Sequence, residues 1–259
     1  MADPLVRLET EGFVATVTLN RPEKLNALTS GMLAELETIA AGLERRDDIR
    51  VVLLTGAGAK AFCAGADIAD WGSYAPLDFG RHWVREGHRV FDRWARLRQP
   101  LLAVLNGIAF GGGLELAACA DLRVAEAHVR VALPESRIGI IPGWSGTQRL
   151  VRRAGPSAVK RLALTGEPVD AEEALRLGLV DYLRPTGDGM VFARTLATTI
   201  AERAPIAVQT AKQLVNVAEG EEAAAALEAI AGALAATTED AAEGVAAFRD
   251  KRPATFTNR

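Results

Sequence analysis

The pattern of apolar and polar residues near the start of the chain changes from a strand period to a helix period. Residues 5–22, LVRLETEGFVATVTLNRP, alternate in the manner of two short strands joined by a turn at Glu11 and Gly12. Residues 29–48 then place apolar side chains three and four positions apart, behind a Thr or Ser residue that can cap a helix. This region is therefore predicted to form a strand pair followed by an amphipathic helix.

Two continuous apolar runs predict strands that are buried on both faces, VVLLTG at 51–56 and PLLAVLNG at 100–107. Between them, residues 78–98 place their large apolar side chains mainly on one helical stripe. Residues 128–136, HVRVALPES, alternate again and are stopped by Pro134. The recurring order of strand, loop and helix predicts an α/β core of repeated β-β-α units rather than a sandwich or a bundle.

From about Ala201 the chain contains almost no strand formers and ends in alanine-rich, amphipathic sequence. We therefore expect a core over residues 1–200 and a helical region over 201–259. A region of that size is too small to bury much surface by itself. Its apolar stripe is expected to cover the core or another subunit.

Composition narrows the class of protein without identifying a site. With 49% apolar and 24% charged residues, the 259-residue chain is typical of a soluble globular protein. A net charge of −3 does not favour nucleic acid as a partner. The two cysteines and three histidines have no spacing typical of a metal site or a disulfide framework. Because the chain has neither a signal-peptide pattern nor a membrane-spanning run, we expect a cytoplasmic protein.

Two stretches share one plan: a buried strand, a loop of small residues and then a predicted helix start. They are VVLLTGAGAKAFCAGADI at 51–68 and PLLAVLNGIAFGGGLEL at 100–116. If the loops lie side by side, one backbone amide from each could bind a single oxygen that carries developing negative charge, forming an oxyanion hole. Close packing of strand against helix also selects glycine and is the alternative explanation. Neither loop has the GxGxxG or P-loop lysine pattern, which disfavours a dinucleotide or ATP site.

Two glutamates near these loops favour the oxyanion-hole explanation. Glu115 follows Gly112 by three residues, so a helix beginning near Gly112 presents an amide and a carboxylate on one face. Glu135 follows the alternating segment through Pro134. Two carboxyl groups beside one oxyanion hole can divide the work, one holding a proton while the other polarises water. The alternative is that both are ordinary acids in the first turn of a helix.

Several motifs in order resemble the enoyl-CoA hydratase/isomerase, or crotonase, superfamily along nearly the whole chain. They include LNRPEKLNAL, AFCAGADI, NGIAFGGGLELAACADLRVA, LPESRIGIIPGWSGTQRL and EGVAAFRDKRPATF. The resemblance implies a spiral of β-β-α turns with a C-terminal helical region that builds homotrimers, often paired into hexamers. It also implies that the backbone amides of Ala66 and Gly112 hold the thioester oxygen of an acyl-CoA substrate.

Both acid positions of the hydratases are matched here, by Glu115 and Glu135. The resemblance therefore implies an enzyme that adds water across the C2=C3 bond of a trans-2-enoyl-CoA, giving a 3-hydroxyacyl-CoA. Glu115 is expected to orient and activate the water, and Glu135 to deliver a proton to C2. No cofactor is expected, because coenzyme A is part of the substrate. The alternatives are an isomerase, a hydratase of a specialised unsaturated acyl-CoA, and a catalytically idle CoA-binding or RNA-binding relative.

The resemblance also implies residues that contact coenzyme A. They are Lys24, Ala64, Asp67, Ile68, Phe248 and Lys251. Some hydratases carry the phosphate-binding lysine one position earlier, where this chain has a glutamate, and a neighbouring subunit often supplies the last two residues. A helix cap is the alternative role for Asp67. Trp144 stands where many relatives have a small residue, and it either trims the acyl pocket or simply packs.

Overall fold

The computed structural model describes residues 3–259, which form two compact units. The division places the described residues up to Gln209 in one unit and Thr210–Arg259 in the other. It falls within helix α9 (Pro205–Ala218). The first unit contains every strand of the described chain and all the elements around the candidate site.

The first unit is built on a six-stranded sheet in the order β1-β2-β3-β5-β7-β10. These strands are β1 Val6–Glu11, β2 Val14–Leu19, β3 Val51–Gly56, β5 Leu101–Leu105, β7 Leu122–Glu126 and β10 Tyr182–Arg184. The first two form the predicted antiparallel pair, and all other neighbours are parallel. The two apolar runs identified in the sequence are β3 and β5, and both are fully buried.

A second sheet has four short strands, most of which come directly after a strand of the first sheet along the chain. Its order is β4-β6-β8-β9, with strands β4 Ala61–Cys63, β6 Ile108–Phe110, β8 Arg130–Ala132 and β9 Val169–Asp170. Along the chain, β3 leads to β4, β5 to β6 and β7 to β8, so each turn of the chain contributes one strand to each sheet. The predicted α/β spiral of repeated β-β-α units is therefore confirmed.

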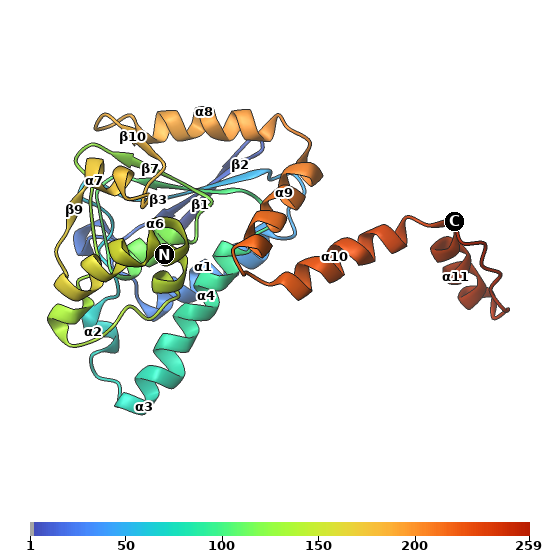
Figure 1. The fold of residues 1–259 in the computed structure, drawn as a ribbon, viewed down its shortest axis with the longest axis horizontal. Helices are drawn as coiled ribbons and strands as arrows, with labels where there is room; N and C mark the ends of the chain where they lie inside the picture. Colours follow the sequence, from blue (N-terminus) through green and yellow to red (C-terminus); the bar gives the residue numbers. More distant parts are fainter. Residues whose placement is uncertain (1–2) are drawn as a thin grey trace. The chain divides into compact units, whose positions relative to one another are not determined.

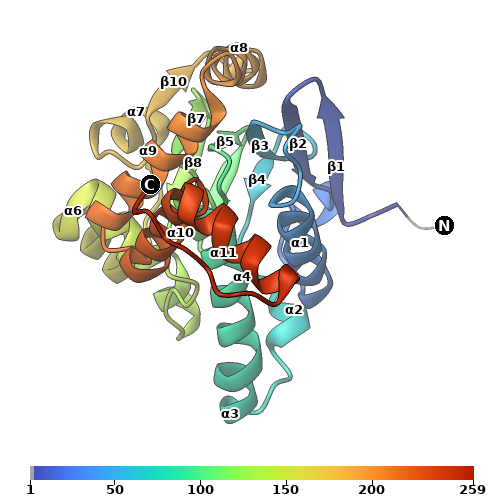
Figure 2. The same ribbon diagram turned by 90° about the vertical axis from the view of Figure 1, so that its right-hand side faces the viewer.

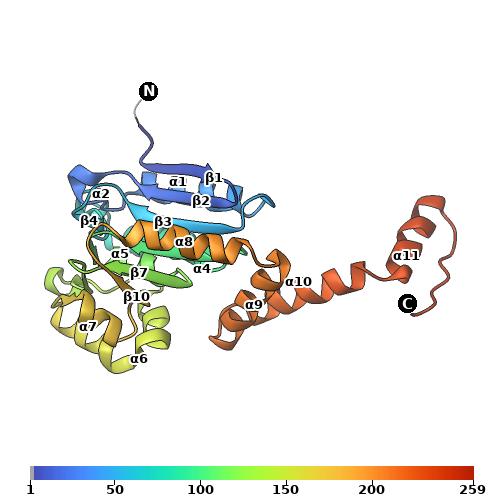
Figure 3. The ribbon, with the colours of Figure 1, turned by 90° about the horizontal axis from the view of Figure 1, so that it is seen from above.

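Alternate side chains of the large sheet fill two apolar cores. Val51 and Leu53 of β3 pack with helix α8 (Gly189–Ala201), which lies along one face of the sheet (Figures 1 and 3). Val52 and Leu54 point into the larger core on the opposite face. Burying one such side chain contributes about 1.5–3 kcal/mol, which makes this double-sided burial the main support of the scaffold.

The larger core is covered by helices whose apolar stripes the sequence predicts. Helix α1 (Ser30–Leu43) is capped by Thr29, whose hydroxyl accepts a hydrogen bond from Met32 N at 3.2 Å. The helix expected over 78–98 is a run of three segments, α3 Pro76–Asp78, the π-helical turn η2 Phe79–Val84 and α4 Arg85–Ala95. It ends three residues early, because Arg96 leaves the helical conformation.

The remaining helices of the first unit are short, apart from one. They are the 3-10 helix η1 Pro22–Lys24, α2 Ile68–Trp71, α5 Gly112–Ala118, the 3-10 helix η3 Glu135–Ile138, α6 Gly146–Thr165 and α7 Ala171–Arg176. Helix α5 begins at Gly112, as the spacing to Glu115 requires. The starts of α2, α5, η3 and α6 are the elements that build the candidate site.

The second unit is helical, in agreement with its composition. It contains α10 Ala223–Ala236 and α11 Glu239–Asp250, and the last residues return along α11 (Figure 2). Asp240 accepts hydrogen bonds from the amides of Thr257 and Asn258 at 2.6 and 2.7 Å, which fixes this return. Over residues 3–259, no helix is both long and apolar enough to cross a membrane.

Candidate active site

A cavity of about 280 Å³ lies where four segments of the first unit meet. Its wall includes the loop before α2, the π-helical turn η2, the start of α5 and the segment that runs from Pro134 to Trp144. Most of the lining is apolar, with Ile, Trp, Phe and Val side chains. Glu115 and Glu135 both face this cavity. An apolar pocket with a few converging polar groups is the usual form of a small-molecule site.

The two glycine-containing loops lie side by side at this cavity. A Cβ placed on Gly65 would lie 3.6 Å from Gly112 N, and one placed on Gly112 would lie 3.6 Å from Ala66 N. Gly112 is the first residue of α5, and the geometry of a helix leaves its amide without an acceptor in the same helix. The loop before α2 is held by hydrogen bonds of Leu28, which donates to Gly65 O and accepts from Asp67 N, both at 2.8 Å.

The glycines at the start of α5 make room for specific neighbours. Gly111 has φ of +51°, a conformation that glycine adopts at little cost, and a Cβ there would lie 2.6 Å from Glu135 Oε1. A Cβ on Gly113 would collide with the carbonyl oxygen of Cys63 on β4. Close packing and access to the cavity therefore both explain the bare backbone. The two explanations considered from the sequence are compatible.

The Glu115 side chain is almost fully buried, at 2% exposure, and the backbone holds it. Its Oε1 accepts hydrogen bonds from Trp144 N and Gly146 N, both at 2.9 Å. Burial raises the pKa of the Glu115 carboxyl, while these backbone amides and the Arg149 guanidinium oppose that rise. Two backbone N–H groups therefore donate hydrogen bonds that favour the charged form of the Glu115 carboxyl.

The Glu135 carboxyl has different surroundings, although it faces the same cavity. It is 8% exposed, and within residues 3–259 its Oε2 has no hydrogen-bond partner. Burial raises the pKa of Glu135 to about 7, its own backbone amide opposes this, and the charge of Glu115 adds to the rise. A carboxyl with this pKa is protonated in an appreciable fraction of molecules at neutral pH.

Trp144 packs against other aromatic rings and also lines the cavity. Its ring lies 5.1 Å from the rings of Trp83 and Phe91, measured between centroids. Its indole also fills the space beside Gly87, where a Cβ would collide with it, and a Cβ on Gly112 would lie 2.9 Å from it. The side chain therefore closes the wall next to the start of α5.

The remaining residues implied by the resemblance fall into different places. Ala64 and Ile68 line the cavity. Asp67 caps α2 by accepting from Ala69 N at 3.0 Å, and it forms an ion pair of 2.8 Å with Arg21. The helix-cap alternative thus describes Asp67, and this carboxylate is not part of the lining.

Lys24 ends η1 on the surface, with its charge acting on Asp67. Phe248 and Lys251 belong to the second unit. Phe248 is 87% exposed on α11, and Lys251 adopts a left-handed conformation at the end of that helix. All three side chains are therefore open to a ligand or to another subunit.

Sequence reasoning missed much of the cavity wall. Phe79 and Trp83 of η2, and Ile138 and Ile141 after Glu135, line the cavity with Arg137. The aromatic residues of η2 follow a helical stripe that is equally typical of an ordinary core, so their pattern could not reveal the pocket. The isoleucines carry no pattern of their own, although their proximity to Glu135 in the sequence is a usable signal.

Comparison with known proteins identifies the family of the chain. The family model described as "Enoyl-CoA hydratase/isomerase" matches residues 9–259. The chain is 40% identical to a short-chain-enoyl-CoA hydratase of Clostridium acetobutylicum, with 95% of each chain covered. It is 35% identical to a crotonyl-CoA hydratase of Syntrophomonas wolfei, with 100% of each covered. A solved structure of an enoyl-CoA hydratase from Bacillus anthracis matches with a TM-score of 0.82 at 34% identity, covering 98% of this chain and 100% of that one.

These similarities extend over the whole fold described above, including both sheets and the segments that form the cavity. The chain belongs to the enoyl-CoA hydratase/isomerase family and has the crotonase fold. The resemblance drawn from the sequence motifs is therefore confirmed.

Proposed function

We propose that this protein is an enoyl-CoA hydratase that adds water across the C2=C3 bond of a trans-2-enoyl-CoA. The observation that carries the proposal is the position of Glu115 and Glu135 on one cavity, beside the adjoining loops of Ala66 and Gly112. The names of the two relatives above, which are both hydratases, support the same reaction. The cavity wall is apolar and suits the hydrocarbon part of an acyl group.

In the proposed mechanism, the amides of Ala66 and Gly112 donate to the thioester oxygen. That oxygen gains negative charge as water adds at C3, because the electrons of the double bond move toward the carbonyl group. Donors fixed in place before the reaction stabilise this enolate-like state, and loss of one such donor typically costs about 3–4 kcal/mol. The proximity of the two loops supports this role.

The two glutamates divide the proton transfers. Glu115, whose Oε1 accepts hydrogen bonds from two backbone amides, orients the water and accepts its proton as oxygen bonds to C3. Glu135, whose raised pKa favours a protonated carboxyl, gives its proton to C2. One proton leaves water and one proton reaches carbon, so the product is the 3-hydroxyacyl-CoA and no cofactor is consumed. Before the next turnover, Glu115 gives its proton to solvent and Glu135 takes one up. Acid–base assistance of this kind contributes about 10²–10⁴-fold.

Purified protein mixed with crotonyl-CoA tests the proposal. Hydration removes the conjugated double bond, so we expect ultraviolet absorbance to fall and the product mass to rise by one water. Glu115→Gln and Glu135→Gln should each lower kcat by about 10²–10⁴-fold. The exposed Glu167→Gln is the matched control and should keep wild-type activity. Wild-type activity in either active-site variant would refute the mechanism.

The same assay separates the alternatives. Isomerisation leaves the mass of the thioester unchanged, whereas hydration adds one water. An idle binding protein would bind acyl-CoA in calorimetry and turn over none of a panel of short, long, branched and aromatic enoyl-CoAs. Paired carboxyls beside the cavity favour hydration over both.

The proposal includes a homotrimer or a dimer of trimers. Large apolar side chains of the second unit are exposed, namely Leu227, Leu234, Val245, Phe248 and Phe256. Side chains of this kind support burial against another copy of the chain. Phe248 and Lys251, which the family motif connects with coenzyme A, would then reach it from their own or a neighbouring subunit, and Lys24 would approach its phosphates. Light scattering should give a mass of three or six chains.

A further inference from the structure

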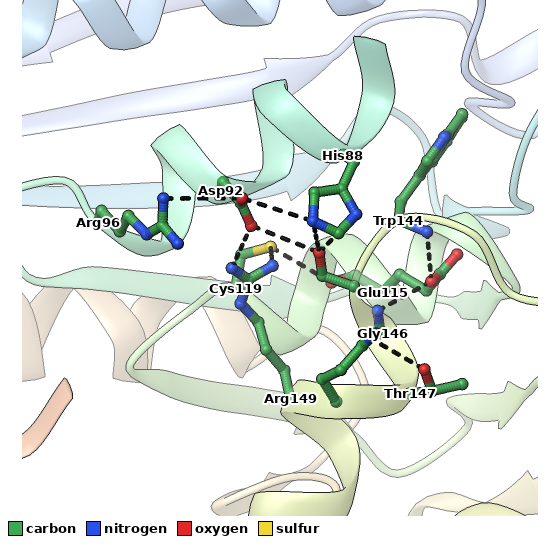
Figure 4. A network of polar contacts seen from close by, with 11 residues as sticks. His88, Asp92, Arg96, Glu115, Cys119, Trp144, Gly146, Thr147 and Arg149 are labelled. Atoms are coloured by element: carbon green, nitrogen blue, oxygen red, sulfur yellow. Dashed lines mark hydrogen bonds and ion pairs between the residues drawn. The ribbon is translucent and has the colours of Figure 1, made fainter. Parts of the chain in front are cut away.

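A polar network lies next to Glu115. Figure 4 shows His88 and Asp92 of α4 near Cys119, which follows α5, and Arg149 of α6, next to the Glu115 side chain. None of these four residues lines the cavity. The reaction proposed above gives them no role.

Ser145 connects this network to the backbone that holds Glu115. It stands between Trp144 and Gly146, whose amides both donate to Glu115 Oε1. Its φ of +67° lies in the left-handed region, which is uncommon for residues other than glycine. A left-handed residue can turn the amides on either side of it toward one anion, and here Trp144 N and Gly146 N donate to the same carboxylate oxygen.

The Ser145 hydroxyl is not used as its position predicts. Ser145 is the N-cap of α6, where serine normally accepts a hydrogen bond from an amide of the first turn, but its side chain makes no such bond. Instead, its Oγ lies 3.0 and 2.9 Å from the two ring nitrogens of His88 and 3.4 Å from Asp92 Oδ1. Ser145 is only 8% exposed, whereas the His88 side chain is half-exposed.

The residues that contact Ser145 are themselves anchored. Asp92 Oδ1 accepts from Arg149 at 2.6 Å, and Asp92 Oδ2 lies 3.5 Å from His88 Nε2. Arg149 is 5% exposed, and its amide donates to the carbonyl oxygen of Ser145 at 3.1 Å. The loop is therefore tied to α4 through its side chain and to α6 through its main chain.

We propose that Ser145, held by His88 and Asp92, is a positioning residue: it fixes the loop whose amides orient the Glu115 carboxylate toward the water. The proposal rests on the hydratase function proposed above. The groups that bear on the charge of Glu115 are Glu135 from η3, Arg149 from α6 and Cys119 from the end of α5. Ser145 and His88 act through the loop and touch none of the reacting atoms.

The test compares Ser145→Ala and His88→Ala with the wild-type protein in hydration of crotonyl-CoA. Each variant should lower kcat by about tenfold and leave KM within about twofold, because the substrate contacts stay while the water is held less well. The acidic limb of kcat/KM should move to higher pH, because looser amides favour the charged form of Glu115 less. His88→Gln keeps a side chain that can bond Ser145 Oγ and should restore part of kcat.

The chain offers a matched control in His82→Ala. His82 pairs with Asp78 four residues away, at 3.7 Å, as His88 pairs with Asp92, but it is exposed and, among the described residues, forms no hydrogen bond or ion pair with the loop. This variant should keep wild-type kcat, KM and pH profile. Thermal unfolding monitors every variant, and Ser145→Gly, which relieves the left-handed conformation, replaces Ser145→Ala if the latter does not fold.

The outcomes are distinguishable. Wild-type kcat and an unmoved acidic limb in the folded Ser145 and His88 variants would overturn the positioning role while leaving the hydratase function intact. A change in His82→Ala equal to that in His88→Ala would also overturn it, because the effect would then not depend on the loop. If the wild-type protein hydrates no enoyl-CoA, the proposed function fails, and the positioning role fails with it.

Discussion

Glu115 and Glu135 are the same side chain on the same cavity, yet the protein surrounds them in opposite ways. Glu115 Oε1 receives two backbone hydrogen bonds, with an arginine close by. Glu135 Oε2 has no partner among the described residues, and the pKa of Glu135 rises to about 7. The difference teaches that a chain can prepare one carboxyl as a base and another as an acid through backbone donors, burial and nearby charges.

The backbone beside each carboxyl differs as well. Glu115 is accommodated by Gly146, where a Cβ would collide with its side chain, and Glu135 by Gly111. Gly146 also donates to the carboxylate that it accommodates. The hydrogen bonds to Glu115 therefore depend on the loop of residues 143–146. The position of Glu135 depends on free space at the start of α5.

The largest effect on stability is expected from Trp144→Ala, which removes a buried indole but keeps the amide that binds Glu115. Emptying this site should lower the free energy of unfolding by about 3–5 kcal/mol. The kcat/KM of bulkier enoyl-CoAs should rise relative to that of crotonyl-CoA, because loss of the indole enlarges the cavity. Urea unfolding and a substrate panel measure the two effects, with Trp144→Phe as the milder control. Unchanged stability and unchanged substrate preference would contradict a role of the Trp144 side chain in closing the cavity wall.

Glu135→Gln should stabilise the protein in alkaline solution. Because burial raises the pKa from its ordinary value of 4.5 to about 7, the carboxyl costs nothing below the lower value, and its cost grows as pH rises between the two. Above that interval the neutral variant should be more stable than wild type by about 3 kcal/mol. Urea unfolding at about pH 4.5 and about pH 8.5 measures the difference. An equal stability difference at both values would contradict the raised pKa.

Gly111→Ala disturbs Glu135 directly. Its Cβ would meet Glu135 Oε1, and its φ of +51° is unfavourable for alanine. Displacement of the acid should lower kcat for hydration by about 100-fold, or about 2.7 kcal/mol. The acidic limb of the pH profile, which reports Glu115, should stay in place. A shift of that limb would mean that the two carboxyls are not independently positioned.

Much of the fold could be predicted because buried apolar residues recur along the sequence with the period of a strand or of a helix. The strand pair at the start, the two apolar strands β3 and β5, and the start of α5 at Gly112 all follow from local patterns. Part of the site followed too, since Glu115 and Gly112 lie on one short helix and the helix period relates them directly. The end of the helix expected over 78–98 was placed three residues too late, because helix boundaries depend on caps that the apolar stripe does not encode.

Other parts of the site depend on contacts that the sequence does not encode locally. His88 and Ser145 are 57 residues apart and meet only because α4 crosses the start of α6. The serine precedes a helix and looks like a cap, and the half-exposed histidine looks like a surface residue. Likewise, an aromatic stripe does not distinguish the cavity wall formed by Phe79 and Trp83 from ordinary core.

The pH dependence of kcat/KM for hydration of crotonyl-CoA tests the division of roles between the two carboxyls most directly. Absorbance of the conjugated thioester reports the rate between about pH 5 and about pH 9. With a protonated Glu135 as the acid, the rate should fall by tenfold per pH unit above about 7, as a single proton is lost. A rate that stays level up to about pH 9, or one that rises through neutral pH, would contradict the assignment.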